Sequence, residues 1–235
     1  MLSRTHSLDQ INSLIGPIDT LLVPQGMEYR AVCQGIGTSQ GNLKLMPIPV
    51  GRQPVSNYLN QWQHQLPRGI MLMGLGGSLS QKYRVGDLVL YRDCGDLQEQ
   101  QWYSCDYQLS ELVFQKVGNR VSWGRGITSD RVISLAEEKC RLGEKYHADI
   151  VDMEGIAILN WCRSLDIPLV MLRVISDSCQ QDLPDLTAAF DRDGNLSPLK
   201  LTYQLLKNPP NSIHLIRSSL QSLMTLQKLA KDLFN

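Results

Sequence analysis

The sequence DIVDMEGIAILNWCRSLDIPLVMLRVISD, residues 149–177, contains the pattern that decides the fold. The apolar runs Asp149–Met153 and Pro168–Ile175 predict two buried strands, and the second is rich in branched residues. Between them, Gly155–Leu165 (GIAILNWCRSL) predicts a mostly apolar helix. A strand, a helix and a strand in this space predict one βαβ crossover, with both strands parallel in one sheet and their carboxyl ends at the same edge.

The rest of the chain alternates short apolar runs with amphipathic ones, which predicts an α/β fold. Further strands are expected at Asp19–Pro24, Lys44–Val50, Gly69–Met73 and Arg84–Tyr91. The two prolines of Lys44–Val50 indicate an edge or irregular strand. Further helices are expected from Met27–Cys33, Pro54–Gln65, Ser134–Tyr146 and Ile213–Phe234, the last packing on the body.

Two other segments are read differently. Gly74–Gly77 is expected to be a turn after the Gly69–Met73 strand. It does not match the dinucleotide fingerprint, because Leu79 stands in the place of the third glycine. Arg92–Trp123 is polar and aromatic by turns, which predicts loops with short strands.

Length and charge limit the organisation and the partners. A chain of 235 residues predicts a single domain over residues 1–235. Lys and Arg number 23, as do Asp and Glu, and this zero net charge argues against a nucleic-acid partner. No apolar run approaches the ~18 residues of a membrane span, and the first twenty residues show no signal-peptide core. We therefore expect a cytoplasmic protein without a membrane partner.

The cysteines and histidines point to neither a disulfide framework nor a metal. The six cysteines include no C-x-x-C pair, and the four histidines are far apart in sequence. Reduced thiols in a reducing compartment are the expectation, with no metal and no cofactor.

Polar residues or glycines follow four of the predicted strands, at the end where α/β proteins bind ligands. The four groups are Glu28, the segment Gly74–Gly77, Glu154, and Ser176 with Asp177. Each carboxylate has a structural alternative. Ser176 and Asp177 are also typical helix caps, Glu154 is also typical of a helix first turn, and Glu28 is also compatible with a solvated helix surface. The conjunction of three acids at one edge favours a ligand site, because a ligand would use charges that otherwise repel one another.

These residues carry a resemblance. Val151–Ala157 (VDMEGIA) resembles the V-E-M-E-x-x-A segment of the purine nucleoside phosphorylase and nucleosidase superfamily, and Arg173–Asp177 (RVISD) resembles its R-x-I-S-D segment. The spacing of the two segments, the glycines followed by Val85-Gly86-Asp87, and the early Glu28 also match. The resemblance spans roughly residues 19–180 and is closest to the methylthioadenosine/S-adenosylhomocysteine nucleosidases.

The resemblance implies a three-layer α/β/α sandwich with a mixed central sheet, a homo-oligomer, and cleavage of a ribosyl N-glycosidic bond. By resemblance, Asp177 with Ser176 protonates the departing base, Glu28 orients water, and Arg173 lies behind the acids. Glu154 and Met153 would hold the ribose. The remaining substrate-binding positions implied by the family are Gly74, Gly76, Gly77, Val132 and Ile133.

The sequence also departs from the family pattern. Val132 stands where the nucleosidases stack an aromatic ring on adenine, and the first acid of V-E-M-E is Asp152. Superfamily phosphorylases hold phosphate with an arginine two or three residues before the glycines, where this chain has Leu72 and Met73. Hydrolysis of a small-molecule nucleoside is therefore favoured.

Two alternatives stay open. One is a phosphorylase that binds phosphate through substitutes such as Arg30, Arg52 or Arg68. The other is a non-catalytic nucleoside-binding protein of the same fold.

Overall fold

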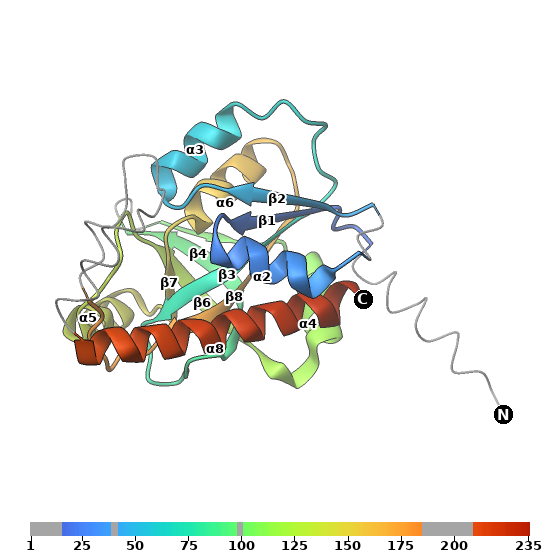
Figure 1. Ribbon diagram of the computed structural model, residues 1–235. Coiled ribbons are helices and arrows are strands. Elements are labelled where there is room, and N and C mark those ends of the chain that lie inside the picture. The colour runs from blue at the N-terminus through green and yellow to red at the C-terminus, as the bar shows by residue number, and fades with distance from the viewer. Residues whose placement is uncertain (1–15, 39–41, 98–100, 185–208) are drawn as a thin grey trace.

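The computed structural model describes residues 16–38, 42–97, 101–184 and 209–235. Within these ranges, an eight-stranded mixed sheet is covered by helices on both faces (Figure 1). The strands are β1 Thr20–Pro24, β2 Lys44–Ile48, β3 Ile70–Ser78, β4 Leu88–Asp96, β5 Trp102–Ser104, β6 Val121–Thr128, β7 Ile150–Asp152 and β8 Leu169–Asp177. The helices are α2 Met27–Ile36, α3 Arg52–Asn60, α4 Tyr107–Val117, α5 Ala136–Tyr146, α6 Gly155–Ser164 and α8 Pro209–Phe234, with a short 3₁₀ turn at Gly118–Arg120.

The sheet closes partly on itself. Its strands run in the order β2-β1-β3-β7-β6-β4-β5, and β8 pairs with both β3 and β4. The pairings of β3, β8, β4, β6 and β7 therefore form a closed circuit. The α/β class and the mixed sheet expected from the sequence are confirmed, and β2, which contains Pro47, is an edge strand as expected.

The predicted crossover is wrong in one respect. β7 and β8 do lie in one sheet, but β3 pairs with β8 in parallel and with β7 antiparallel, so β7 and β8 run in opposite senses. β7 meets only the end of β3, where Gly77 opposes Val151 and Ser78 opposes Ile150. Because β7 points back along β3, its carboxyl end faces the middle of β8 rather than the end of β8.

The glycine segment is strand rather than turn. Residues Gly74–Gly77 all belong to β3, which continues to Ser78 beside β8. A Cβ at Gly76 would lie 2.7 Å from Ile150 Cδ1 and 3.1 Å from the Val151 carbonyl oxygen, so glycine suits the close approach of β7 here. β8 likewise extends beyond the predicted end and includes Ser176 and Asp177, with a register shift between Gly76 and Gly77.

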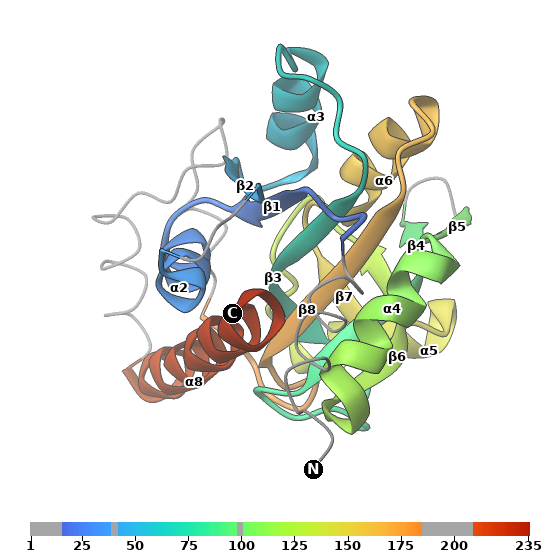
Figure 2. The same ribbon diagram turned by 90° about the vertical axis from the view of Figure 1, so that its right-hand side faces the viewer.

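The helices form two layers with separate apolar cores (Figure 2). On one face, Val32 of α2, Val113 of α4 and Leu226 of α8 pack on β1, β3 and β8. On the other face, Leu59 of α3 and Ile158 of α6 pack on the opposite side of the same strands. Since both faces of β8 are covered, its sequence is a nearly continuous apolar run.

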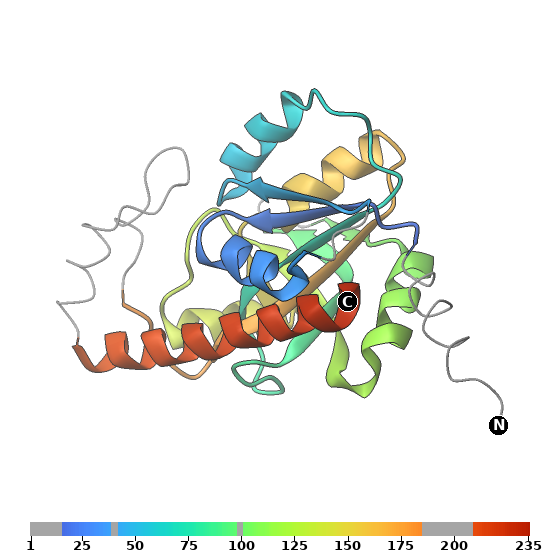
Figure 3. The same ribbon diagram turned by 45° about the vertical axis from the view of Figure 1, so that its right-hand side comes forward.

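The last helix, α8, lies along α2 and under the sheet (Figure 3). This confirms the expected packing of the C-terminal segment, although the helix begins at Pro209. A Cβ at Gly35 of α2 would lie 2.2 Å from the Gln227 carbonyl oxygen, so α2 and α8 are in backbone contact there. None of the helices described here has an apolar stretch long enough to span a bilayer.

Helix α4 was not predicted. It occupies the middle of Arg92–Trp123, where loops and short strands were expected. Asp106 caps it by accepting a hydrogen bond from the Leu109 backbone N–H at 2.7 Å. An Asp before a periodic apolar segment is a helix-start signal, so the sequence did contain the evidence.

Candidate active site

Arg173 lies at the centre of the site. It occupies the middle of β8 and is fully buried. Its Nη2 donates hydrogen bonds to Asp152 Oδ2 and to Glu154 Oε2, each at 3.1 Å. Asp152 ends β7 and Glu154 follows it, so the reversed direction of β7 brings both carboxylates to mid-β8.

Asp152 is held by several donors. Its Oδ1 accepts from Thr128 Oγ1 at 2.7 Å and from the Gly155 backbone N–H at 3.0 Å. Its Oδ2 accepts from Tyr91 Oη at 3.2 Å in addition to Arg173. These bonds use the carboxylate for structure, since they fix the start of α6 and the guanidinium.

Glu28 approaches the same guanidinium from the other side of β3. It lies in the first turn of α2, is partly buried, and accepts a hydrogen bond from the Leu75 backbone N–H at 2.7 Å. A Cβ at Gly74 would lie 2.4 Å from Arg173 Nη1 and 2.5 Å from Glu28 Oε2. Glycine at 74 therefore leaves the space in which the acid and the guanidinium meet. We call Arg173, Asp152, Glu154 and Glu28 the Arg173 cluster.

The cluster contains three acids and one base in a buried setting, and this shifts the pKa of Glu28, Glu154 and Arg173. Burial raises the pKa of Glu28 to about 7, and the Glu154 charge adds to the effect while Arg173 opposes it. Burial also raises the pKa of Glu154, against the lowering influence of Arg173. Although burial alone would lower it, the surrounding carboxylates hold the pKa of Arg173 above its ordinary value. A carboxyl that titrates near neutrality is suited to proton transfer.

The side chains of Glu154 and Glu28 have partners other than a helix cap or bulk water. Glu154 occupies the N-cap position of α6, yet its side chain makes no capping bond. Its Oε1 accepts instead from the Gly51 backbone N–H at 3.1 Å, and its side chain is buried. Glu28 is partly buried, and its carboxylate accepts from the Leu75 backbone N–H, so it is not a fully solvated side chain.

A second group lies farther along β3 and β8. Asp177 is buried beside Gly77, where an added Cβ would lie 3.0 Å from Asp177 Oδ1. Its Oδ2 accepts from Ser176 Oγ at 2.7 Å, and its Oδ1 accepts from Lys139 Nζ at 2.5 Å. Because Ser176 and Asp177 are the last residues of β8, they do not cap a helix within the described chain. Lys139 and Asp177 form the Lys139–Asp177 pair.

The remaining predicted residues are placed as follows. Met153 is partly exposed between β7 and Glu154. Ile133 is buried in a small apolar cluster with Leu79 and Val151, and Val132 before it is partly exposed. Their contact with a ligand stays a prediction. No group of three or more His, Cys, Asp or Glu is arranged to hold a metal in the part of the chain that the structure describes.

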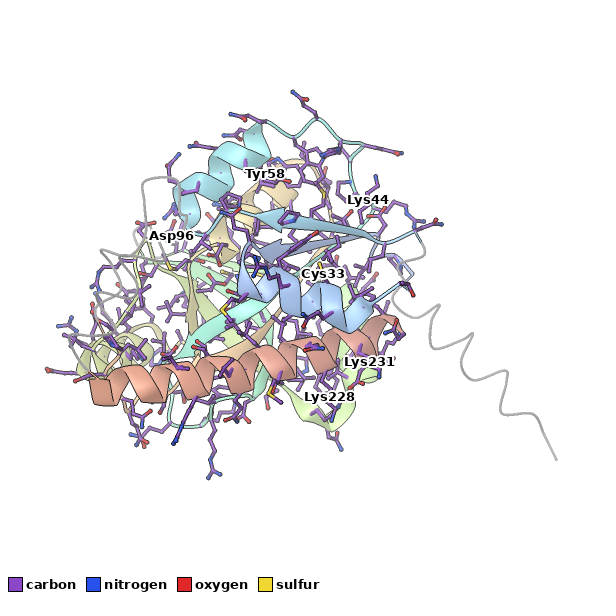
Figure 4. The ribbon with its side chains drawn as sticks, in the orientation of Figure 1. Cys33, Lys44, Tyr58, Asp96, Lys228 and Lys231 are labelled. Atoms are coloured by element: carbon purple, nitrogen blue, oxygen red, sulfur yellow. The ribbon has the colours of Figure 1, made fainter. Side chains whose placement is uncertain are left out.

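The arginines considered as phosphate ligands are engaged or exposed. Arg52 forms an ion pair with buried Asp96 at 2.7 Å, and Figure 4 labels Asp96 beside the first turn of α3. Arg68 pairs with Asp19 at 3.2 Å and is mostly exposed. Arg30 is exposed on α2.

Sequence reasoning did not assign Lys139 to the site. It lies in a charged helix segment, AEEKCRLGEKY, which resembles a solvated face. A usable signal was the spacing, because Lys139, Leu142, Gly143 and Tyr146 share one helix face. At Gly143 an added Cβ would lie 2.3 Å from the Leu79 carbonyl oxygen, so this is the packed face of α5.

Comparison with known proteins places this site in a family. The sequence profile described as "Phosphorylase superfamily" matches residues 28–197, which include Glu28, Glu154, Arg173 and Asp177. The chain belongs to the phosphorylase superfamily. Compared with curated protein sequences, this superfamily member has no match.

Solved structures agree with the family. The chain is similar to 5'-methylthioadenosine/S-adenosylhomocysteine nucleosidase of Campylobacter jejuni, with a TM-score of 0.62, 16% identity, and coverage of 90% of this chain and 97% of that one. It is also similar to Arabidopsis thaliana 5'-methylthioadenosine nucleosidase, with a TM-score of 0.61, 16% identity and 90% coverage of each chain. A futalosine hydrolase mutant of Helicobacter pylori gives a TM-score of 0.60, 16% identity, and coverage of 86% and 97%. At this identity the likeness establishes the fold.

Proposed function

We propose that this phosphorylase superfamily member is a nucleosidase, which hydrolyses the N-glycosidic bond of a purine nucleoside such as methylthioadenosine or S-adenosylhomocysteine. One observation carries the proposal. Arg173, at the centre of the cluster, and Asp177 lie on the same strand, β8, where they pair with Gly74 and Gly77 of β3. Arg173 and Asp177 are four residues apart on β8, roughly 13 Å in an extended strand, comparable with the length of a nucleoside.

The chemistry of the two groups suits this reaction. Glycoside hydrolysis passes through an oxocarbenium-like transition state, so the leaving group needs a proton and the opposite face needs a nucleophile. Asp177 gives a proton to N7 of the base while the glycosidic electron pair moves to N9. Glu28 removes a proton from the water whose oxygen bonds to C1′. With a pKa of about 7, the Glu28 carboxylate is available to do this near neutral pH.

Glu154 is suited to hold the ribose. Both of its oxygens already accept one hydrogen bond, from Gly51 and from Arg173. A carboxylate oxygen has two acceptor positions, so each can still accept a bond from a ribose hydroxyl. The fixed backbone and guanidinium contacts would orient the carboxylate before the substrate binds.

Water is favoured over phosphate as the nucleophile. A phosphate would meet Glu28 and Glu154, and like charges disfavour its approach. Arg52 is engaged with Asp96 and Arg68 with Asp19. Three solved structures that are similar to this chain are of nucleosidases, and one of the three, from Helicobacter pylori, is of the enzyme with butyl-thio-DADMe-Immucillin-A.

A product assay tests the proposal. The purified protein is incubated with methylthioadenosine, S-adenosylhomocysteine, adenosine and inosine, with and without phosphate, and free base and sugar are measured by mass spectrometry. We expect free base and free ribose (or its 5′-substituted form) at equal rates in both conditions. Phosphate-dependent release with a sugar 1-phosphate product would establish a phosphorylase. A shift in melting temperature with no free base would establish a binding protein.

Glu28→Gln locates the activity in this site. The amide keeps the size of the side chain and can accept from Leu75, but it cannot take a proton from water. Hydrolysis should fall by ~10²-fold or more, the usual contribution of a general base. Glu137→Gln is the matched control, because Glu137 is exposed on α5. Equal activity in the two variants would contradict the role of Glu28.

A further inference from the structure

Lys139 of α5 places its ammonium group beside Asp177, the candidate acid. The residue is fully buried, and Nζ donates to Asp177 Oδ1 at 2.5 Å, to the Ser178 carbonyl at 3.1 Å and to the Gln181 carbonyl at 3.4 Å. An ammonium has three protons, so these three acceptors use all of them. The group is therefore satisfied entirely by β8 and the loop after it.

A buried ion pair of this kind is an expensive way to stabilise a fold. Well-packed apolar residues of similar size are often as stabilising or more so. Lys139 reaches a residue that the proposed reaction requires, at the one oxygen that Ser176 does not contact. This placement points to a role in the reaction rather than in folding alone.

The hydrogen bond from Ser176 to Asp177 Oδ2 can be exchanged for another. Its hydroxyl has one proton but two acceptors in range, Asp177 Oδ2 at 2.7 Å and the Gly76 carbonyl at 3.1 Å. When a proton from solvent occupies Oδ2, the hydroxyl can turn to Gly76. Lys139 stays on Oδ1, so the proton for the base is held on Oδ2.

We propose that Lys139 is a positioning residue for proton delivery: it fixes Asp177 through Oδ1 and stabilises the carboxylate that forms when Oδ2 gives its proton to the departing base. The inference rests on the nucleosidase function proposed above. The Oδ2–H bond breaks and an N7–H bond forms, while the glycosidic electron pair moves to N9. Lys139 keeps its three protons throughout. A fixed charge next to a developing carboxylate in a water-poor site lowers the barrier of such a step.

Other titratable groups near the Lys139–Asp177 pair come from α5 and from the loop after β8. Cys140 follows Lys139 on α5, and its Sγ donates to the Cys179 carbonyl at 3.6 Å. Burial raises the pKa of the Cys179 thiol, so it stays neutral over the range tested. Asp182 accepts from the Ala136 backbone N–H at the start of α5. On β3, Gly77 pairs with Asp177 and leaves room for its carboxylate.

The test uses two substrates with different needs for a proton. The purine base leaves only when protonated, whereas 4-nitrophenolate leaves 4-nitrophenyl β-D-riboside without one. For Lys139→Met we expect kcat on the purine nucleoside to fall by ~10²-fold, and kcat on the nitrophenyl riboside to change by less than about threefold. Lys139→Arg should restore most of the activity, and Lys145→Met, an exposed lysine on the same helix, should match the wild type.

A pH profile on the purine nucleoside gives a second readout. A positive charge beside a proton donor favours loss of the proton, so removing that charge in Lys139→Met should move the optimum of kcat/KM upward. Lys139→Arg should leave the optimum in place. If Lys139→Met does not fold, Lys139→Gln is compared with Lys139→Arg in the same two assays.

The outcomes separate the two proposals. Equal losses on both substrates with an unmoved optimum would show a merely structural lysine and overturn this inference, while the nucleosidase function would stand. A wild-type protein that cleaves no nucleoside would overturn both. Loss confined to the purine nucleoside, together with the upward shift, would support the inference.

Discussion

The Arg173 cluster and the Lys139–Asp177 pair differ in their balance of charge. The Arg173 cluster places three carboxylates around one guanidinium, whereas the Lys139–Asp177 pair matches one carboxylate with one ammonium. Burial, together with the neighbouring acids, raises the pKa of Glu28 to about 7. In the cluster, which has more acids than bases, Glu28 keeps its proton until near neutral pH. In the pair, the ammonium of Lys139 holds the carboxylate of Asp177 in one position. A reaction that needs both a base and an acid can use this difference.

Removing the guanidinium should produce the largest effect. Arg173→Met leaves Asp152 and Glu154 buried without a cation, and breaking a buried pair costs about 3–5 kcal/mol in the free energy of unfolding. Urea denaturation measures it. The loss should grow as the pH rises above neutrality, where the acids must ionise. Arg141→Met, at an exposed arginine of α5, is the control and should change stability little. If the free energy of unfolding of Arg173→Met changed little and equally at every pH, the buried acids would not depend on Arg173 for their stability.

Removing the acidic proton should have the next largest effect. Asp177→Asn keeps the size of the side chain and can still accept from Lys139, but it cannot protonate the base. Base release should fall by ~10²-fold or more, with nucleoside binding little changed. Steady-state kinetics and calorimetric binding measure the two quantities. Asp166→Asn, at an exposed position with left-handed backbone that Asn tolerates, should be neutral. Full activity in Asp177→Asn would exclude Asp177 as the acid.

The stored proton should appear in the pH dependence of stability. The unfolded chain releases the Glu28 proton near its ordinary pKa of 4.5, and the folded chain keeps it until about 7. Between these values the folded state binds more protons, so raising the pH destabilises the wild-type protein. Glu28→Gln lacks this loss. Its free energy of unfolding, measured by urea denaturation relative to wild type, should rise by roughly 2 kcal/mol from pH 4.5 to 8, less than the full shift because the group is partly exposed.

The control for this effect is Glu137→Gln, whose difference from wild type should be flat over the same range. A flat difference for Glu28→Gln as well would mean that the cluster does not perturb Glu28.

Altering the ribose contact should give the smallest effect. Glu154→Gln removes one charge from the cluster and weakens the acceptor for the ribose hydroxyls. KM should rise and kcat should fall together, lowering kcat/KM by about tenfold. The same variant brings the cluster closer to balance, so the pH optimum should move toward lower pH as Glu28 ionises more readily. A change in kcat alone would place Glu154 outside the ribose site.

Much of the architecture was readable from the sequence because it depends on local patterns. The strands and helices that were predicted are present, with ends that differ by up to about five residues, and Glu28, Glu154 and Asp177 lie at or beyond the ends of β1, β7 and β8. Apolar runs identify buried strands whatever their partners are. The same reasoning missed α4, although Asp106 signals its start.

Strand direction was not readable. The crossover rule predicted β7 parallel to β8, but the closed circuit of strands turns β7 back along β3. For this reason Glu154 meets Arg173 in the middle of β8 instead of joining Asp177 at its end. Pairing of β7 with β3 and β6 is a long-range property, and no residue within β7 specifies it.

The sequence by itself determined which residue types stand beyond which strands. Only the tertiary structure decided their charge environment. A pKa depends on the charges around a group and on how far the group is removed from water. The pKa of Glu28 is set by its burial and by residues that include Glu154 and Arg173, more than a hundred positions away in the sequence. Lys139 shows the same limit, because a charged helix residue becomes the partner of Asp177 only where α5 packs against the end of β8.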